Sequence, residues 1–184
     1  MKYYRILDDL DVPNRWLLGE INFQSMQEMW NYTRSGEVFP SQNELVVNIK
    51  KKGSPIDFTF ADFDVIIINE KLSKLLNLNE VQLIPIKIDR NENNHFLMVT
   101  KLEFDCVDEQ NSEFLKYEID DIARPDLVGD YRNFFKLIID PILVNESNIF
   151  RVKKYDVAII VSEKLKNVFE KNYIRGIKFK EVTL

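Results

Sequence analysis

The 184-residue sequence contains one cysteine, one histidine and five glycines. With Cys106 alone, the chain can form neither an internal disulfide nor a cysteine-based metal cluster. The single histidine, His95, cannot build the common metal sites that use several histidines. The glycines lie far apart in the sequence, so they form no glycine-rich loop around a phosphate group. We therefore expect no metal site and no cofactor.

Long apolar runs are also missing. Apolar runs such as residues 65–68 are far shorter than the roughly 20 residues that span a bilayer. Polar and acidic residues follow soon after Met1, whereas a secretory signal needs an apolar run of about 7–15 residues. Together with the single cysteine, these observations favour a soluble protein of the reducing cytoplasm and predict no membrane partner.

The sequence has no excess of basic residues. Acidic residues outnumber basic residues, 30 to 25, which gives a formal net charge of −5. This balance argues against a nucleic-acid partner, because phosphates require clustered Lys and Arg, and it is compatible with a basic protein partner. The run Lys50-Lys51-Lys52 is interpreted as a solvated hairpin end, with phosphate contact as the alternative.

Apolar periodicity predicts an α+β fold, with a mixed or antiparallel sheet and a few short helices. We expect one domain over residues 1–184, in which residues 1–44 carry few of the signals. A helix is predicted over residues 25–33, with Trp30 in the core, whereas Trp16 fits either the core or a contact surface. A long polar loop is predicted over residues 89–94. Strands are predicted over residues 3–7, 45–49, 81–88, 96–102, 104–107 and 136–139.

The most informative pattern is an imperfect internal repeat, with units at about residues 57–88 and 149–182. An aromatic-Asp-Val step occurs in both units, and the alignment resumes after one extra residue, Ala158, in the second. Each unit predicts an aromatic-Asp turn, a buried strand, a helix and a further strand. The corresponding residues are Asp64 and Asp156 in the turns, Asn69 and Ser162 as helix N-caps, and Leu72, Leu75, Leu76, Leu165, Val168 and Phe169 on the buried helix faces.

Three kinds of side chain are candidates for chemistry. His95 could act as a general base and Cys106 as a nucleophile, but we favour a loop or strand-edge histidine and a buried structural thiol. Carboxylates gather in residues 57–64, 105–108 and 120–121, and hydrolases use paired carboxylates. Their spacing is not diagnostic, so turn caps and solvated loops are the favoured interpretation. No catalytic residue is predicted, and a carboxylate-dependent hydrolase stays an alternative.

Several segments, taken in order, resemble an immunity-protein family of bacterial polymorphic toxin systems, the immunity protein eleven type, once catalogued as a domain of unknown function. The resemblance covers about residues 45–184. It implies a bacterial cytoplasmic protein that binds and neutralises a cognate toxin without catalysis, and it supplies no contact residues. The segments that carry it are residues 67–72 before 83–86, residues 106–108 with Ser112, and residues 149–152, 159–165 and 176–179.

Acidic loops are the candidate contact regions for a basic toxin, because opposite charges accelerate association. The segment 105–113 and the loop 89–94 are the two candidates. A general regulatory or scaffold module remains a further alternative, and the sequence does not indicate an oligomeric state. The predicted contact residues are Asp105, Asp108, Glu109, Asp89 and Glu92.

Overall fold

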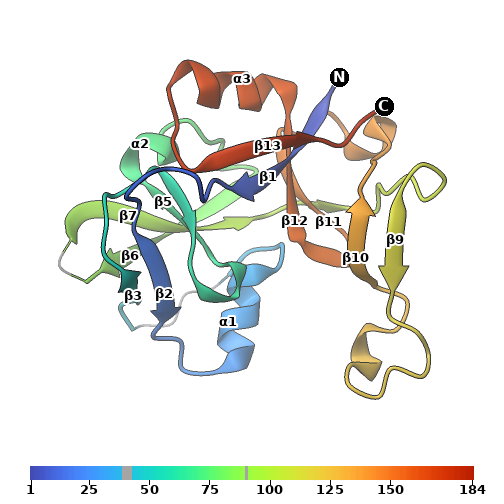
Figure 1. Ribbon diagram of the computed structural model, residues 1–184, viewed down its shortest axis with the longest axis horizontal. Helices are drawn as coiled ribbons and strands as arrows, with labels where there is room; N and C mark the ends of the chain where they lie inside the picture. Colours follow the sequence, from blue (N-terminus) through green and yellow to red (C-terminus); the bar gives the residue numbers. More distant parts are fainter. Residues whose placement is uncertain (39–42, 90) are drawn as a thin grey trace.

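The computed structural model describes residues 1–38, 43–89 and 91–184, except for the side chain of Glu92. Within these residues the chain is mostly β-structure with three short α-helices, which confirms the predicted α+β class. The strands form a six-stranded sheet, a five-stranded sheet and a separate two-stranded arm. Figure 1 shows the arm projecting from the side of the molecule, away from the six-stranded sheet.

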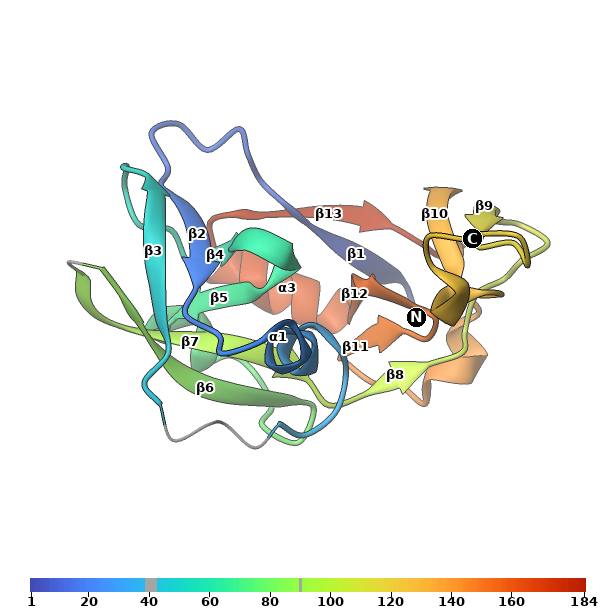
Figure 2. The ribbon, with the colours of Figure 1, turned by 90° about the horizontal axis from the view of Figure 1, so that it is seen from below.

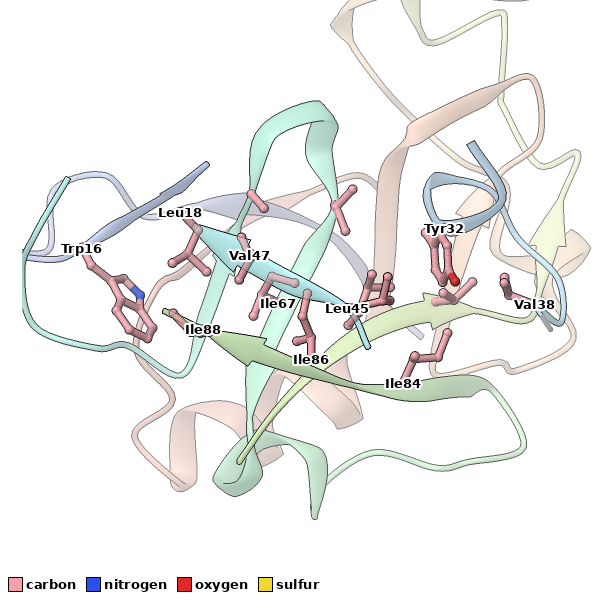
Figure 3. Packing of buried hydrophobic residues seen from close by; sticks show 14 of the residues in the cluster. Trp16, Leu18, Tyr32, Val38, Leu45, Val47, Ile67, Ile84, Ile86 and Ile88 are labelled. Atoms are coloured by element: carbon pink, nitrogen blue, oxygen red, sulfur yellow. The ribbon is translucent and has the colours of Figure 1, made fainter. Parts of the chain in front are cut away.

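The six-stranded sheet has the order β2-β3-β6-β7-β5-β4. One face of this sheet packs over an apolar core, in which Trp16 lies at one end and Tyr32 at the other (Figure 3). The helix α1 lies beside β7, and the one-turn helix α2 follows β5 directly. The elements are β2 (Leu17–Ile21), α1 (Met26–Thr33), β3 (Val46–Lys51), β4 (Phe58–Phe60), β5 (Ile66–Asn69), α2 (Glu70–Ser73), β6 (Val81–Ile88) and β7 (Asn91–Thr100).

The five-stranded sheet has the order β13-β1-β12-β11-β8, and the arm pairs β9 with β10. A second apolar core lies between this sheet and the base of the arm, and it contains Phe150, Ile160, Cys106 and Phe134. The elements are β1 (Tyr3–Asp8), β8 (Glu103–Phe104), β9 (Glu113–Lys116), β10 (Tyr131–Lys136), β11 (Ile149–Val152), β12 (Tyr155–Ser162), α3 (Glu163–Lys171) and β13 (Ile177–Glu181).

Both repeat units fold as strand–helix–strand, as the sequence predicts: β5-α2-β6 in the first and β12-α3-β13 in the second. In each unit the two strands joined by the helix are not neighbours, because an antiparallel strand lies between them. That middle strand is β7 in the first unit and β1 in the second. The two units therefore share a topology. The middle strand of the first unit follows that unit directly in the sequence, whereas the middle strand of the second unit lies far from it.

The predicted helix caps are present in both units. The Asn69 side chain accepts a hydrogen bond from the Leu72 amide at 3.0 Å, and the Ser162 hydroxyl accepts one from the Leu165 amide at 3.2 Å. These bonds satisfy amides in the first helical turn that have no partner within the helix. A short polar side chain at this position therefore fixes where each helix begins.

A polar residue stands directly before β4 in the first unit and before β11 in the second, and it binds the helix N-cap; Asp57 is buried and Asn148 is partly buried. Asp57 accepts a hydrogen bond from the Asn69 side chain at 2.8 Å, and the Ser162 hydroxyl donates to the Asn148 side chain at 3.0 Å. The cap amides bind the same two residues, since Asn69 N lies 3.0 Å from Asp57 O and Ser162 N lies 2.9 Å from Asn148 O. Asp57 and Asn148 are thus structurally equivalent.

This equivalence shifts the sequence alignment by one residue where β4 of the first unit is matched with β11 of the second. The alignment pairs Phe58 with Phe150, but Phe58 lies opposite Ile68 and Ile149 lies opposite Val161, so Phe58 corresponds to Ile149. An irregularity in the β11–β12 pairing near Val152 accommodates the extra length of the second unit.

The two units contact each other reciprocally. Asp57 accepts a hydrogen bond from the Arg175 amide at 2.7 Å, just before β13, and Glu80 accepts one from the Asn148 amide at 2.6 Å, just before β6. A third apolar core joins the units, and its members include Phe58, Ile68, Leu72, Ile149, Val161, Leu165 and Phe169. Each unit thus covers apolar surface that the other would expose.

The predicted aromatic-Asp turn is right in the first unit and wrong in the second. Phe63 and Asp64 have positive φ angles of 62° and 57°, which fits a tight turn. Asp156 lies inside β12 instead, and the turn falls earlier, where Lys154 has a φ of 64°. The added residue in the second unit lets β12 extend back through the aspartate.

Three predicted β boundaries are wrong. Strand β10 ends at Lys136, and in the predicted strand 136–139 only Ile139 forms a bridge, with Val107. The predicted strand 104–107 is reduced to β8 and that bridge. The predicted loop 89–94 is shorter than expected, because β7 already begins at Asn91, opposite Ile88. Backbone pairing continues through these polar residues, and side-chain polarity alone did not reveal it.

The prediction that Trp30 lies in the core is wrong, and Trp16, for which the sequence left core or contact surface open, is the core residue. Trp16 is buried, with 2% of its surface exposed, and belongs to the core of the six-stranded sheet. Trp30 is only partly buried and lies under the Arg34 guanidinium, 5.6 Å from the ring centroid. Helix α1 buries Met29 and Tyr32 instead, so its inward face is rotated from the predicted one.

Candidate interaction surface

The two-stranded arm is anchored to the body by aromatic packing at its base. Phe114, Tyr131 and Phe134 pack together with ring centroids 4.7–5.7 Å apart. Phe134 also packs against Tyr155 of β12 at 4.9 Å, and the Tyr131 amide donates to the Lys154 carbonyl at 3.1 Å. The base of the arm is therefore fixed relative to the five-stranded sheet.

The loop that joins β9 to β10, residues 117–130, is named the arm tip. Two backbone hydrogen bonds of 3.0 Å close it, from the Tyr117 amide to Asp130 and from the Gly129 amide to Tyr117. The Asp121 carboxylate accepts hydrogen bonds from two following amides at 3.1 and 3.2 Å. Arg124 binds Asp126 through two nitrogen atoms, at 3.0 and 2.9 Å. These internal contacts give the arm tip a defined conformation.

Large apolar side chains are exposed on the arm and its tip. Ile119 and Ile122 are 93% and 95% exposed, whereas scattered exposed apolar residues elsewhere are ordinary in soluble proteins. Because exposed apolar surface is one mark of interaction sites, the arm is a candidate interaction surface. The other exposed apolar residues of the arm are Leu115, Val128 and Phe135.

The excess negative charge of the chain is concentrated in and beside the arm. Residues 105–136 contain nine acidic and four basic residues, whereas the rest of the chain contains 21 of each. This short region therefore accounts for the whole net charge of −5. A local excess of this kind attracts a positively charged surface and repels anionic ones.

The three predicted contact residues beside the arm differ in their surroundings. Asp105 is exposed. Asp108 caps a turn by accepting hydrogen bonds from the Asn111 side chain at 2.7 Å and the Gln110 amide at 3.1 Å, and these bonds, that of the Asn111 side chain foremost, lower its pKa. The Glu109 carboxylate binds Lys116 and then the Tyr131 hydroxyl, both at 2.6 Å, which lowers its pKa. Glu109 thus also joins the two strands at the arm base, whereas Asp108 fixes the turn before the arm.

The other two predicted contact residues lie elsewhere. Asp89 and the backbone of Glu92 belong to the β6–β7 hairpin, and the Glu92 side chain lies outside the described residues. Both views place this hairpin at the opposite end of the molecule from the arm (Figures 1 and 2). The structure therefore does not bring the two predicted groups together on one face.

His95 is an interior residue of the six-stranded sheet, which corrects the predicted loop or strand-edge position. Strand β7 lies between β6 and β5, and only 4% of His95 is exposed. Its ring lies 5.5 Å from that of Trp16, and Nδ1 lies 2.9 Å from the Asn93 carbonyl oxygen. Burial lowers the pKa of His95. An open groove of about 920 Å³ borders the residue, lined also by Pro85 and Phe96.

Cys106 is a buried structural thiol, as predicted. Cys106 lies in the core beneath the five-stranded sheet, whereas His95 lies in the six-stranded sheet and packs against Trp16. The two residues therefore do not form a pair. Burial, with a smaller contribution from the charge of Asp105, raises the pKa of the Cys106 thiol to about 12. The thiol is therefore protonated and shielded at neutral pH.

Several of the clustered carboxylates have structural partners. Asp57 binds Asn69 and Arg175, and Asp62 pairs with Lys50 at 3.0 Å. Asp121 caps a turn in the arm tip. In the described part of the chain, no three His, Cys, Asp or Glu side chains come together as metal ligands. None of the helices described is long and apolar enough to cross a membrane.

The model of the immunity protein family Imm11 matches residues 23–183. The chain belongs to this family. Membership confirms the resemblance drawn from the sequence, and it indicates a role in toxin immunity within polymorphic toxin systems, with a protein toxin as the general kind of partner. A comparison with curated proteins found no match. The family match begins after β1, although β1 is the middle strand of the second repeat unit in this member.

Sequence reasoning missed the arm tip as a contact candidate. From the sequence alone, Ile119 and Ile122 would be assigned to the core, because isoleucine is usually buried and a sequence does not show exposure. The available signal was local composition, since two isoleucines so close together are unusual in a solvated turn, where Gly, Pro, Asn, Asp and Ser prevail.

Proposed function

We propose that this protein neutralises one cognate toxin by stoichiometric, noncovalent binding, without turnover. The match to an immunity protein family over residues 23–183 is the observation that carries the proposal. The bacterial cytoplasm is the proposed place of action, because the toxin must be blocked where it would act.

The surface properties of the chain support binding as the mode of action. The arm and the segment before it, residues 105–136, combine exposed apolar side chains with the whole excess negative charge, a combination suited to docking on a basic protein. The two residue types that often act as nucleophile or base, Cys106 and His95, are both buried and are used in packing. Affinity in the nanomolar range, about −12 kcal/mol, is the scale that effective blocking requires.

The test is a titration of toxin activity. The toxin domain encoded beside this gene is purified, and its residual activity is measured against increasing amounts of the protein. Inhibition that ends at about one protein per toxin supports the proposal. Complete inhibition at far lower ratios would require catalytic inactivation of the toxin and would contradict it, as would the absence of any complex between the two proteins.

A further inference from the structure

We propose that the arm tip is the anchor of the toxin contact, and that Ile119 and Ile122 enter an apolar depression on a basic toxin surface. This inference rests on the proposed function and names the surface that performs it. The two side chains are the most exposed large apolar groups in the described residues. Covering them removes from water an apolar surface that the folded chain leaves in solvent.

The conformation of the arm tip suits it to this task. The backbone bonds between Tyr117, Gly129 and Asp130 close the loop, and the Asp121 carboxylate fixes the backbone that follows it. A loop that already has its bound shape loses less conformational entropy on association. The two isoleucines are therefore presented by a preformed element, as effective anchor residues usually are.

The charges around the isoleucines identify the kind of partner. The arm tip contains five acidic residues and one basic residue, Arg124, which is paired with Asp126. Glu118 and Asp120 are exposed next to Ile119. Such a rim repels nucleic acid, an anionic membrane and a second copy of this acidic chain, and it attracts a positively charged protein. A basic toxin surface is the occupant that satisfies both the apolar and the charged features.

The decisive experiment compares two double variants with the wild-type protein. The probe is the inactivated toxin domain encoded beside this gene, and its affinity is measured by calorimetry. Ile119→Ser/Ile122→Ser removes the proposed anchors and should weaken binding by about tenfold or more. The matched control is Leu10→Ser/Leu78→Ser, which changes two leucines that are 66% and 59% exposed away from the arm, and it should bind within about twofold of wild type.

A second pair of variants tests the acidic rim. Glu118→Lys/Asp120→Lys should slow association and reduce its dependence on salt, because steering by charge acts on the association rate. Glu20→Lys/Glu146→Lys changes two exposed glutamates outside the arm and should leave the rate nearly unchanged. Melting curves of all variants verify that each one is folded.

The outcomes separate the two proposals. If wild type binds the toxin and the isoleucine variant binds equally well, the anchor is elsewhere and only the arm-tip proposal is overturned. If wild type itself does not bind the toxin, the proposed function fails and the arm-tip contact fails with it. Selective weakening by the isoleucine variant, with the leucine control unchanged, supports both.

Discussion

Asp57 and Asn148 lie 91 positions apart in the sequence and occupy the same place in the two repeat units. Each one binds the helix N-cap residue of its own unit through the side chain and the backbone carbonyl. Each one is also bonded to the segment that leads into the last strand of the other unit. The pair therefore connects local helix initiation with the packing of the two units.

The first prediction concerns this connection. Asp57→Ala removes the acceptor of the Asn69 side chain and of the Arg175 amide, and it leaves both donors partly buried without a partner. We expect a loss of about 2–3 kcal/mol in the free energy of unfolding, measured with urea. Asp62→Ala, which removes a carboxylate paired with Lys50 near the surface, is the control and should cost less than about 1 kcal/mol. Equal losses would show that Asp57 has no special structural role.

The second prediction concerns pH. Burial lowers the pKa of His95 in the folded protein below its usual value of 6.5, so the unfolded chain binds this proton more readily. The contribution of the neutral His95 ring to the free energy of unfolding is complete above about pH 6.5. It declines as the pH falls from there toward the pKa of the folded state, by at most about 1.4 kcal/mol per pH unit. His95→Gln removes the titrating group. Urea unfolding between about pH 7.5 and 5.5 should therefore show a smaller loss in the variant, and equal losses would refute the assignment.

The third prediction separates two acidic residues that the sequence treats alike. Glu109→Lys places a positive charge next to Lys116 and removes the acceptor of the Tyr131 hydroxyl, so it should lower the melting temperature. Asp105→Lys changes an exposed residue and should leave the melting temperature within about 2 °C. A combined charge reversal that includes Glu109 consequently tests stability as well as binding. If Glu109→Lys melts at the same temperature as wild type, this prediction is wrong.

The fourth prediction concerns the reactivity of Cys106. The thiol is buried and its pKa is raised to about 12, so a thiol reagent should not label the folded protein at pH 8. Labelling should become complete in denaturant, at the rate of unfolding or of local opening. Rapid stoichiometric labelling without denaturant would place Cys106 at the surface and contradict the packing described above.

The features that the sequence could predict depend on neighbouring residues. Asn69 and Ser162 are recognisable as caps because each one binds an amide only three residues further on. The buried strands and the face of α3 with Leu165 and Phe169 follow from short-range periodicity in the same way. The predicted face of the first helix is wrong beyond Leu72, because α2 ends at Ser73 and the partly buried Leu75 and Leu76 lie outside it. The equivalence of the two units was therefore visible before any tertiary contact was known.

The features that the sequence could not predict depend on distant pairing. The bond between Asp57 and Arg175 joins residues 118 positions apart, and no local pattern marks either residue. The partners of Glu109 were hidden for the same reason, and so was its role in the arm base. The polar start of β7 was misread because its strand character comes from pairing with β6 and not from its own side chains.

The position of β1 has a consequence for the order in which the molecule is completed. During synthesis the residues of β1 leave the ribosome long before their partners in β12 and β13, which lie more than 150 positions further along the chain. The first repeat unit finds its middle strand in β7, close by in sequence, and can pair its strands while the chain is still growing. The second unit is complete only when β1 pairs with β12 and β13. This pairing closes a loop that includes most of the residues described here, and closing so long a loop is slow. Until then the edge of β12 that pairs with β1 stays open, and an unpaired apolar edge of this kind favours aggregation.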